Sequence, residues 1–262
     1  MLESDIIPYH LSPPPGERIV VLAPHPDDET LGCGGTIRLL TKSGKQVKVI
    51  FLTSGDQADP SNPASKIQHG EEHITDYSML REREAMRALK ILGVSDYEFL
   101  RFPDRKLNLH FESVFGRLLD VVKQYAADII YSPSMIELNP DHRTTASLAI
   151  EMQKTVDRTK AGRGPLTLLF YEVATPLRPN VLIDITSSRM RKRKAVKKYK
   201  SQLRITPYLK YIAALNEVRA LTVHGASAVE AFWMVGSPLR TEDITGWLAY
   251  RTPVSKNPQS RS

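Results

Sequence analysis

The stretch Arg18–Gly55, RIVVLAPHPDDETLGCGGTIRLLTKSGKQVKVIFLTSG, decides the fold class. It begins with a short apolar run typical of a buried strand, Arg18–Pro24, and ends with a second run of the same kind, Gln46–Gly55. Between them, apolar residues at helical spacing and a stop at Gly44 predict a helix. A crossover of this length can join two parallel strands, so we expect the chain to open as β-α-β.

The same alternation continues along the chain. Helices are expected over 79–92, 114–125, 142–156, 186–203 and 207–222, and strands over 97–102, 128–133, 166–173 and 180–185, with a final apolar run EAFWMV at 230–235. The pattern predicts the α/β class: a single Rossmann-like domain over 18–250, with a mostly parallel sheet and helices on both faces. Residues 1–17 are expected to be an extended lead-in, 56–70 a loop and 251–262 a polar tail.

Composition excludes several classes of protein. Of 262 residues, 41% are hydrophobic and 25% charged, which is ordinary globular usage and not that of a disordered or fibrous chain. The single cysteine, Cys33, excludes an intrachain disulfide and favours a reducing compartment. No apolar run approaches the roughly 20 residues of a membrane span, and the first residues lack the apolar core of a secretory signal. We therefore expect a cytoplasmic protein.

The net charge of +7 has a local origin. The segment Arg189–Lys200, RMRKRKAVKKYK, holds 8 basic residues and no acid, and without it 28 basic residues face 29 acidic ones. The simplest interpretation is a solvated helix face, with a phosphate-bearing or nucleic-acid partner as the minority alternative. Only one aromatic residue, Tyr199, lies in the run, so no nucleic-acid partner is expected.

Polar side chains follow the first and fourth expected strands. In sheets of this class, ligands bind beyond the carboxyl ends of the strands. APHPDDE at 23–29 and NPDHRTT at 139–145 bring His25, Asp28 and His142 to that edge. Two imidazoles and one carboxylate leave an open position, which is the pattern of a catalytic zinc site.

Other interpretations of the same residues stay open at this point. The acids at 27–29 could simply cap the following helix and complement its dipole. A dinucleotide-binding loop is excluded, because Ile37 stands where the third glycine is required. If the site binds a metal, Asp27 beside the ligand Asp28 would be the general base for metal-activated water.

These motifs resemble the LmbE / PIG-L family of zinc-dependent N-acetylglucosaminyl deacetylases, over roughly residues 18–235. Further matches are GGT at 34–36, PDHR at 140–143, Arg81, Glu84, Ala88, Leu92 and Gly93 in one motif, Phe102, Pro103 and Asp104 in another, and Lys194, Tyr199, Ser201 and Gln202 in a third. The resemblance implies hydrolysis of an N-acetyl group on a glucosamine-type sugar or glycoconjugate. Two alternatives remain: a catalytically inactive sugar-binding α/β protein, and an amidase acting on a thiol–sugar conjugate.

The resemblance also implies roles for individual residues. The expected cofactor is Zn²⁺, with other divalent first-row metals as alternatives, on the three ligands named above. Asp27 is the expected base, and Arg81 and Asp104 are expected to hold sugar hydroxyls. The sequence leaves the oligomeric state and the identity of the sugar open.

One position departs from the family pattern. Many members carry HPDH, whose first histidine stabilises the oxyanion or protonates the leaving group, and here that position is Asn139. Asparagine is no acid, but its amide can donate a hydrogen bond to an oxyanion. Asp141 is expected to orient an imidazole as a second-shell partner of the metal site. The proton for the departing amine must then come from Asp27.

Two further candidates are weaker. His69 and His73 are four residues apart, but the zincin pattern needs Glu directly after the first histidine, where Gly70 stands. We therefore expect a surface junction there. The Cys33 thiol is expected to pack against the sheet and not to bind the metal.

Overall fold

The computed structural model describes residues 10–58, 76–159 and 165–235 of the chain. Its strands are β1 (His10–Leu11), β2 (Arg18–Ala23), β3 (Gln46–Thr53), β4 (Asp96–Phe102), β5 (Ile129–Pro133), β6 (Thr167–Tyr171), β7 (Val181–Asp184) and β8 (Val229–Val235). Its α-helices are α2 (Asp28–Lys42), α3 (Asp76–Leu92), α4 (Phe111–Tyr125), α5 (Pro140–Thr159), α6 (Arg189–Val196), α7 (Lys200–Leu203) and α8 (Tyr208–Ala220), and the 3-10 helices are η1 (Asp56–Ala58) and η3 (Leu107–His110).

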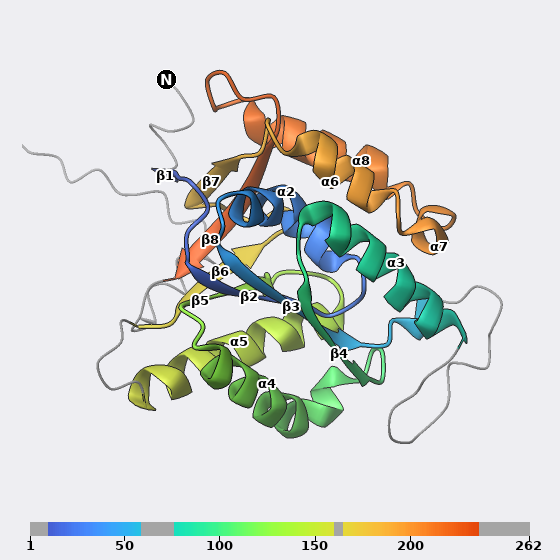
Figure 1. Cartoon of the computed structure of the whole chain (residues 1–262), viewed down its shortest axis with the longest axis vertical. Coiled ribbons are helices and arrows are strands. Elements are labelled where there is room, and N and C mark those ends of the chain that lie inside the picture. Colours follow the sequence, from blue (N-terminus) through green and yellow to red (C-terminus); the bar gives the residue numbers. More distant parts are fainter. Residues whose placement is uncertain (1–9, 59–75, 160–164, 236–262) are drawn as a thin grey trace, which may run out of the picture.

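All eight strands belong to one sheet, in the order β1-β7-β8-β6-β5-β2-β3-β4. β8 runs antiparallel to both of its neighbours, β6 and β7, and the other strand pairs are parallel. Figure 1 shows α2, α3, α6 and α8 on one face of the sheet and α4 and α5 on the other. The expected α/β class, with a mostly parallel sheet covered on both faces, is confirmed.

Two large apolar clusters fill the space between the layers. One joins alternate residues of β2 and β3 to α2, α3 and α6, and the other joins the intervening residues of the same strands to α4 and α5. Because successive side chains of a strand point to opposite faces, near-continuous apolar runs such as Ile19–Ala23 are buried on both sides. This two-sided burial fixes the position of each strand end, where the polar residues begin.

The strand order reverses at the centre of the sheet. From β2 the chain moves through α2 to β3 and β4 on one side, and then returns to place β5 on the other side of β2. A crevice forms where such a reversal occurs, at the carboxyl ends of the two central strands. The loops after β2 and β5 carry the two expected metal-binding motifs to this crevice.

Two expected elements differ from the structure, and two others lie wholly or largely outside the described residues. The helix expected over 186–203 is broken into α6 and α7, because Tyr199 between them has φ −79° and ψ 60° and turns its side chain inward. Part of the lead-in, residues 10–11, forms β1 and pairs with β7. Most of the loop 56–70, with His69 and His73, and the tail 251–262 lie outside the described residues.

In the described ranges, no helix has both the length and the apolar character needed to cross a membrane. The cytoplasmic location stays a prediction.

Candidate active site

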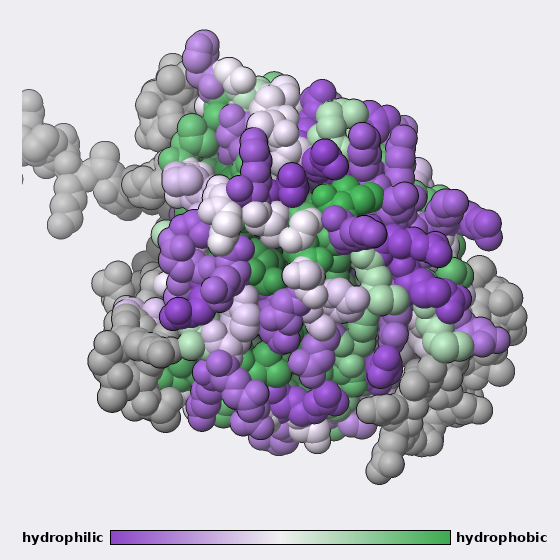
Figure 2. Space-filling view, in the orientation of Figure 1, coloured by the Kyte–Doolittle hydropathy of each residue, from purple (hydrophilic) through white to green (hydrophobic). Residues whose placement is uncertain are grey.

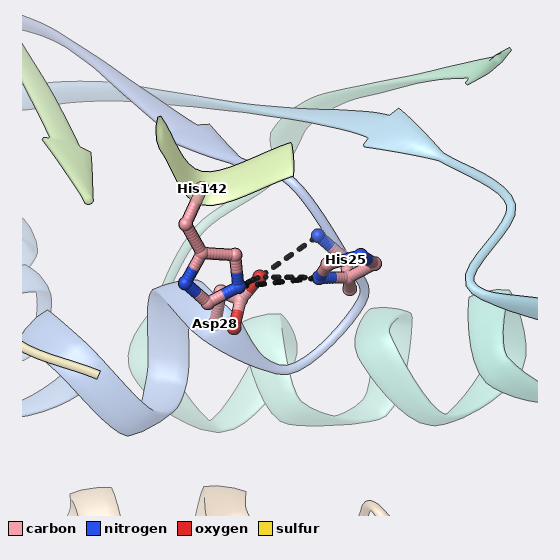
Figure 3. A group of neighbouring side chains, drawn as sticks. All are labelled: His25, Asp28 and His142. Atoms are coloured by element: carbon pink, nitrogen blue, oxygen red, sulfur yellow. Dashed lines mark hydrogen bonds and ion pairs between the residues drawn. The ribbon is translucent and has the colours of Figure 1, made fainter. Parts of the chain in front are cut away.

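Three side chains converge at the crevice. Asp28 Oδ2 lies 3.0 Å from His25 Nδ1 and 3.1 Å from His142 Nε2, and the two imidazole nitrogens are 3.3 Å apart. All three residues are buried. Figure 3 shows the two rings on either side of the Asp28 carboxylate. The structure thus brings together the three residues expected to bind the metal, as a group that could hold one ion.

Local structure sets the direction of each donor. His25 stands between Pro24 and Pro26 in the turn after β2, and its backbone N–H donates to Asp28 Oδ2 over 2.9 Å. Asp28 is the first residue of α2, and His142 is in the first turn of α5. The turn and the two helix starts are short, rigid connections to the sheet, so these donors are held by the core.

Two further carboxylates face the other nitrogen of His25. His25 Nε2 lies 3.1 Å from Asp104 Oδ1 and 3.3 Å from Asp141 Oδ2. Backbone N–H groups fix both carboxylates: Gln57 donates to Asp104, and Arg105 and Leu107 donate to Asp141. The structure places Asp141 on an imidazole, as expected. It also places Asp104 there, a contact that was not expected from the sequence.

These two carboxylates and His25 form a second group able to hold a cation. Both carboxylates of that group already accept backbone hydrogen bonds. A carboxylate that receives the second ring N–H of a metal-bound histidine orients the ring and fixes its tautomer. Asp104 and Asp141 both lie where a carboxylate could orient the His25 ring in this way.

Glu137 takes the corresponding place beside His142. Its Oε2 is 3.8 Å from His142 Nδ1, a nitrogen with no hydrogen-bond partner in the described part of the structure. The Glu137 carboxylate accepts backbone hydrogen bonds from residues 173–175, the loop after β6. Sequence reasoning missed Glu137, and its place in the loop after the fourth strand was the available signal.

The neighbouring charges shift the pKa of each residue in this cluster. Burial lowers the pKa of His25, but Asp104, Asp141 and Asp28 outweigh that effect and hold it well above its usual value. Burial also opposes ionisation of Asp28, yet the two imidazoles hold its pKa far below the usual range. Burial also lowers the pKa of His142, but Asp28 and Glu137 together outweigh that effect and raise it to about 9.

Asp27 lies beside this group, and its side chain does not cap α2. It occupies the N-cap position without a side-chain hydrogen bond to the helix, so the capping interpretation of this residue is wrong. Instead its Oδ2 pairs with Arg81 Nη2 at 3.0 Å. Burial raises the pKa of Asp27 to about 7, and the Arg81 charge limits that rise. A carboxylate with this pKa is suited to accept a proton near neutral pH.

Arg81 is more constrained than a surface sugar-binding residue. It is 2% exposed, and it also donates to the backbone carbonyls of Gly55 and Pro26 at 2.8 and 2.6 Å. Its guanidinium therefore ties the loops after β2 and β3 to α3. It still lines the cavity, but its main contact there is Asp27.

Asn139 has a structural task as well as a place in the cavity. Its Oδ1 accepts a hydrogen bond from the Asp141 N–H at 2.9 Å and thereby caps α5. The amide nitrogen is left to donate elsewhere. Asn139 lines a cavity of about 300 Å³ together with His25, Asp27 and His142. This volume is at the lower end of ligand sites and suits one small polar ring.

The motif assigned to Lys194 in the sequence belongs to Lys192, and the assignment of Lys194 is wrong. Lys192 is buried and donates to Glu230 Oε1 at 2.7 Å and to Asn216 Oδ1 at 3.0 Å, whereas Lys194 is exposed. In the same motif, Ser201 donates to Glu84 at 2.6 Å. The basic segment is thus not wholly a solvated face: seven of its eight cations are exposed and one is in the core. Figure 2 shows mainly hydrophilic side chains over this part of the molecule.

Cys33 lies away from the ligand group. Its thiol is buried in the core cluster and lies 3.3 Å from the carbonyl oxygen of Glu29. Burial raises the pKa of this thiol well above its usual value, so it is a poor metal ligand. The packing role expected for Cys33 agrees with this position.

Comparisons with known proteins show the family of the chain. Residues 20–153, just over half of the chain, match the family model described as PIG-L: GlcNAc-PI de-N-acetylase. The diacetylchitobiose deacetylase of Thermococcus kodakarensis is 29% identical over 213 residues, covering 75% of this chain and 76% of that relative.

Solved structures share the fold. The N,N'-diacetylchitobiose deacetylase of Pyrococcus horikoshii, in complex with an inhibitor, matches with a TM-score of 0.73 and 22% identity, over 94% of this chain and 91% of that one. GalB, the 4-carboxy-2-hydroxymuconate hydratase of Pseudomonas putida, matches with a TM-score of 0.65 and 22% identity, over 85% of this chain and 97% of that one. One fold therefore carries both deacetylases and a hydratase, so the reaction must be argued from the site.

Proposed function

The chain belongs to the PIG-L family, and from that premise we propose that it is a metal-dependent N-deacetylase acting on a glucosamine-type sugar or glycoconjugate. The observation that carries the proposal is the convergence of His25, Asp28 and His142 beside a buried, raised-pKa Asp27 in one small cavity. Zinc is the preferred ion, with other divalent first-row metals as alternatives.

The donor set fits such an ion. Donor atoms that hold one tetrahedral zinc ion at about 2.0–2.2 Å lie roughly 3.3–3.6 Å from one another. The separations of 3.0, 3.1 and 3.3 Å between these three donors are close to that range. Two nitrogens and one oxygen leave a position for water or substrate. A bound divalent ion would supply Lewis acidity there, acting on a water molecule and on the amide carbonyl.

The chain's own residues supply the proton transfers. Asp27 accepts the proton of the attacking water, and Arg81 holds the carboxylate that does so. The amide of Asn139 donates a hydrogen bond to the oxyanion as the carbonyl carbon becomes tetrahedral. Protonated Asp27 then returns the proton to the departing amine, so acetate and the free amino sugar are the products. The two imidazoles keep their orientation through Asp104, Asp141 and Glu137.

An acetate-release assay on zinc-loaded protein tests the proposal. The substrates are N-acetylglucosamine, its β-linked dimer, and N-acetylglucosamine linked to malate or inositol. The expected result is acetate and amine in equal amounts from at least one of them, at a rate that is about 10²–10⁴-fold lower in the Asp27→Asn variant. Sugar binding without any acetate would instead support the inactive sugar-binding protein. Release of a different acyl group from a thiol–sugar conjugate would support the amidase.

A further inference from the structure

The backbone of Asp27 is in a conformation that a non-glycine residue rarely adopts. Its φ is 143° and its ψ is −27°. Positive φ brings Cβ against the backbone, so such a residue persists only where its surroundings hold it. The Asp27 carbonyl accepts the first hydrogen bonds of α2, from the N–H groups of Thr30 and Leu31. Two further contacts hold its other polar groups: the carboxylate pairs with Arg81, and the backbone N–H donates to Glu29 Oε2 at 3.2 Å.

Glu29 is itself held by a residue from a distant part of the chain. It is fully buried, and its Oε1 accepts hydrogen bonds from the Tyr199 hydroxyl at 2.5 Å and from the Thr30 hydroxyl. Both oxygens of the Glu29 carboxylate thus accept hydrogen bonds: Oε2 from the Asp27 N–H, and Oε1 from the Tyr199 and Thr30 hydroxyls. The carboxylate forms a bridge between the proposed base and the break that separates α6 from α7.

Tyr199 has little freedom to move. It is 1% exposed, its ring belongs to the apolar cluster beneath α2 and α3, and it ends the turn that interrupts the expected long helix. A continuous helix over 186–203 would not have this turn. The Glu29 carboxylate therefore contacts both Tyr199, at the interruption of the helix, and the backbone N–H of Asp27, the residue with the unusual φ.

We infer that Tyr199 and Glu29 are positioning residues that hold Asp27 in the orientation needed to accept a proton from water. The inference rests on the proposed function. Neither residue lines the cavity, so neither is placed to touch substrate. Losing the Tyr199 hydroxyl removes one of the two hydrogen bonds on Glu29 Oε1 and leaves that of the neighbouring Thr30, so the carboxylate can rotate away from the Asp27 N–H. Asp27 then relaxes toward an ordinary φ, and its carboxylate moves away from the attacking water.

The experiment compares Tyr199→Phe and Glu29→Gln with Tyr131→Phe. Tyr131 is the matched control, because its buried hydroxyl also donates one hydrogen bond, to the Pro15 carbonyl at 2.8 Å. Misplaced catalytic groups typically cost about 10–100-fold. We expect Tyr199→Phe and Glu29→Gln to lower kcat by about that factor, with KM and metal content unchanged. We expect Tyr131→Phe to keep the kcat of the wild type.

Combined variants show whether the effect passes through Asp27. In the Asp27→Asn background, adding Tyr199→Phe should lower the residual rate no further, because the group it positions is gone. The Tyr199→Phe/Glu29→Gln double variant should be no slower than the slower single variant. Wild-type kcat in Tyr199→Phe, or a fully additive further loss in the Asp27→Asn background, would overturn the inference.

Crystal structures of the wild type, Tyr199→Phe and Tyr131→Phe separate this inference from the proposed function. If zinc-loaded wild type releases no acetate from any N-acetylated sugar, the proposed function fails, and the structures still decide the positioning role. Asp27 at its wild-type φ and still paired with Arg81 in Tyr199→Phe refutes the role. A changed φ in Tyr199→Phe alone supports it.

Discussion

At the scale of single residues, the chemistry depends on how two neighbouring aspartates differ. Asp28 faces two imidazoles, which hold its pKa far below the usual range against the effect of burial. Burial dominates at Asp27 and raises its pKa to about 7. In the proposed mechanism these adjacent carboxylates therefore have separate tasks: Asp28 is the anion that binds the cation, and Asp27 is the group that exchanges protons.

Replacing Asp27 should separate metal binding from turnover. Asp27→Asn keeps the shape of the side chain but cannot accept the proton from water. We expect kcat to fall by about 10²–10⁴-fold while the metal content stays at that of the wild type. Acetate release and elemental analysis on the same preparation measure both quantities. A kcat near that of the wild type would remove Asp27 from its role as base.

The pH profile tests the pairing of Asp27 with Arg81. The base must be deprotonated, so kcat/KM falls as the pH drops through its pKa. The Arg81 charge opposes the rise in that pKa, and Arg81→Met should therefore move the acidic limb to higher pH. Arg81→Lys keeps the charge and should leave the limb in place. A raised KM with an unmoved limb in Arg81→Met would mean that Arg81 acts on the sugar alone.

To test Asn139 as a donor to the oxyanion, a variant must keep the side-chain oxygen that caps α5. Asn139→Ser retains an oxygen for the Asp141 N–H but lacks the amide donor, whereas Asn139→Ala loses both. We expect both variants to lower kcat at least tenfold with zinc retained. Only Asn139→Ala should also lose about 1 kcal/mol of unfolding free energy. Full activity in both would show that asparagine at this position is catalytically neutral.

The sequence was most informative where one residue type has few uses. Histidines at two strand ends with an adjacent carboxylate allow few interpretations, and the structure brings those three residues together. It was least informative for carboxylates such as Glu137 and Glu29, because a lone glutamate in a polar stretch could serve many purposes. Their partners, the N–H groups of 173–175 and the Tyr199 hydroxyl, come from distant segments that only the fold brings near.

At the scale of elements, helix α2 shows how local sequence and distant packing combine. It is kinked at Cys33, with φ −132° and ψ 22°, and the backbone N–H groups of Gly35 and Thr36 after the kink donate to Glu230 on β8 at 2.8 Å. A Cβ at Gly35 would lie 2.8 Å from Ile185, so only glycine allows this close approach. The GGT motif therefore serves the packing of α2.

Lys192 on α6 is a buried cation that pairs with the same glutamate, Glu230. Lys192 and Glu230 are both at least nine-tenths buried, and Lys192→Met leaves the glutamate charge without its ion-pair partner. We expect a loss of about 3–5 kcal/mol in unfolding free energy. Urea denaturation measures it. Lys194→Met, two residues along on the exposed side, is the control and should change stability by no more than about 0.5 kcal/mol. Equal effects of the two variants would contradict the assignment.

At the scale of the whole molecule, the alternation of strands and helices was enough to predict the architecture. Strand ends were predicted to within a few residues, because apolar runs in a sheet buried on both faces have sharp limits. The break between α6 and α7 was not predictable, since the basic run 189–200 has no proline or glycine to end a helix. Contact between Tyr199 and Glu29, which are 170 residues apart, accompanies that break.

The fold alone does not select the reaction, because a hydratase and deacetylases share it. In the proposed function, the metal site and the adjacent Asp27 select the reaction, and they act together. A divalent cation there would balance the carboxylate of Asp28 without protonation of the two imidazoles.

The most direct measurement is a titration of metal-free protein with zinc, followed by the rate of acetate release from an N-acetylated glucosamine substrate. The proposed site predicts that the metal-free protein is inactive, and that the rate rises in proportion to added zinc and reaches its plateau at one equivalent. The His25→Ala variant should bind no stoichiometric zinc and stay inactive throughout. Acetate release that is the same with and without metal, or a His25→Ala variant that titrates like the wild type, would contradict the account.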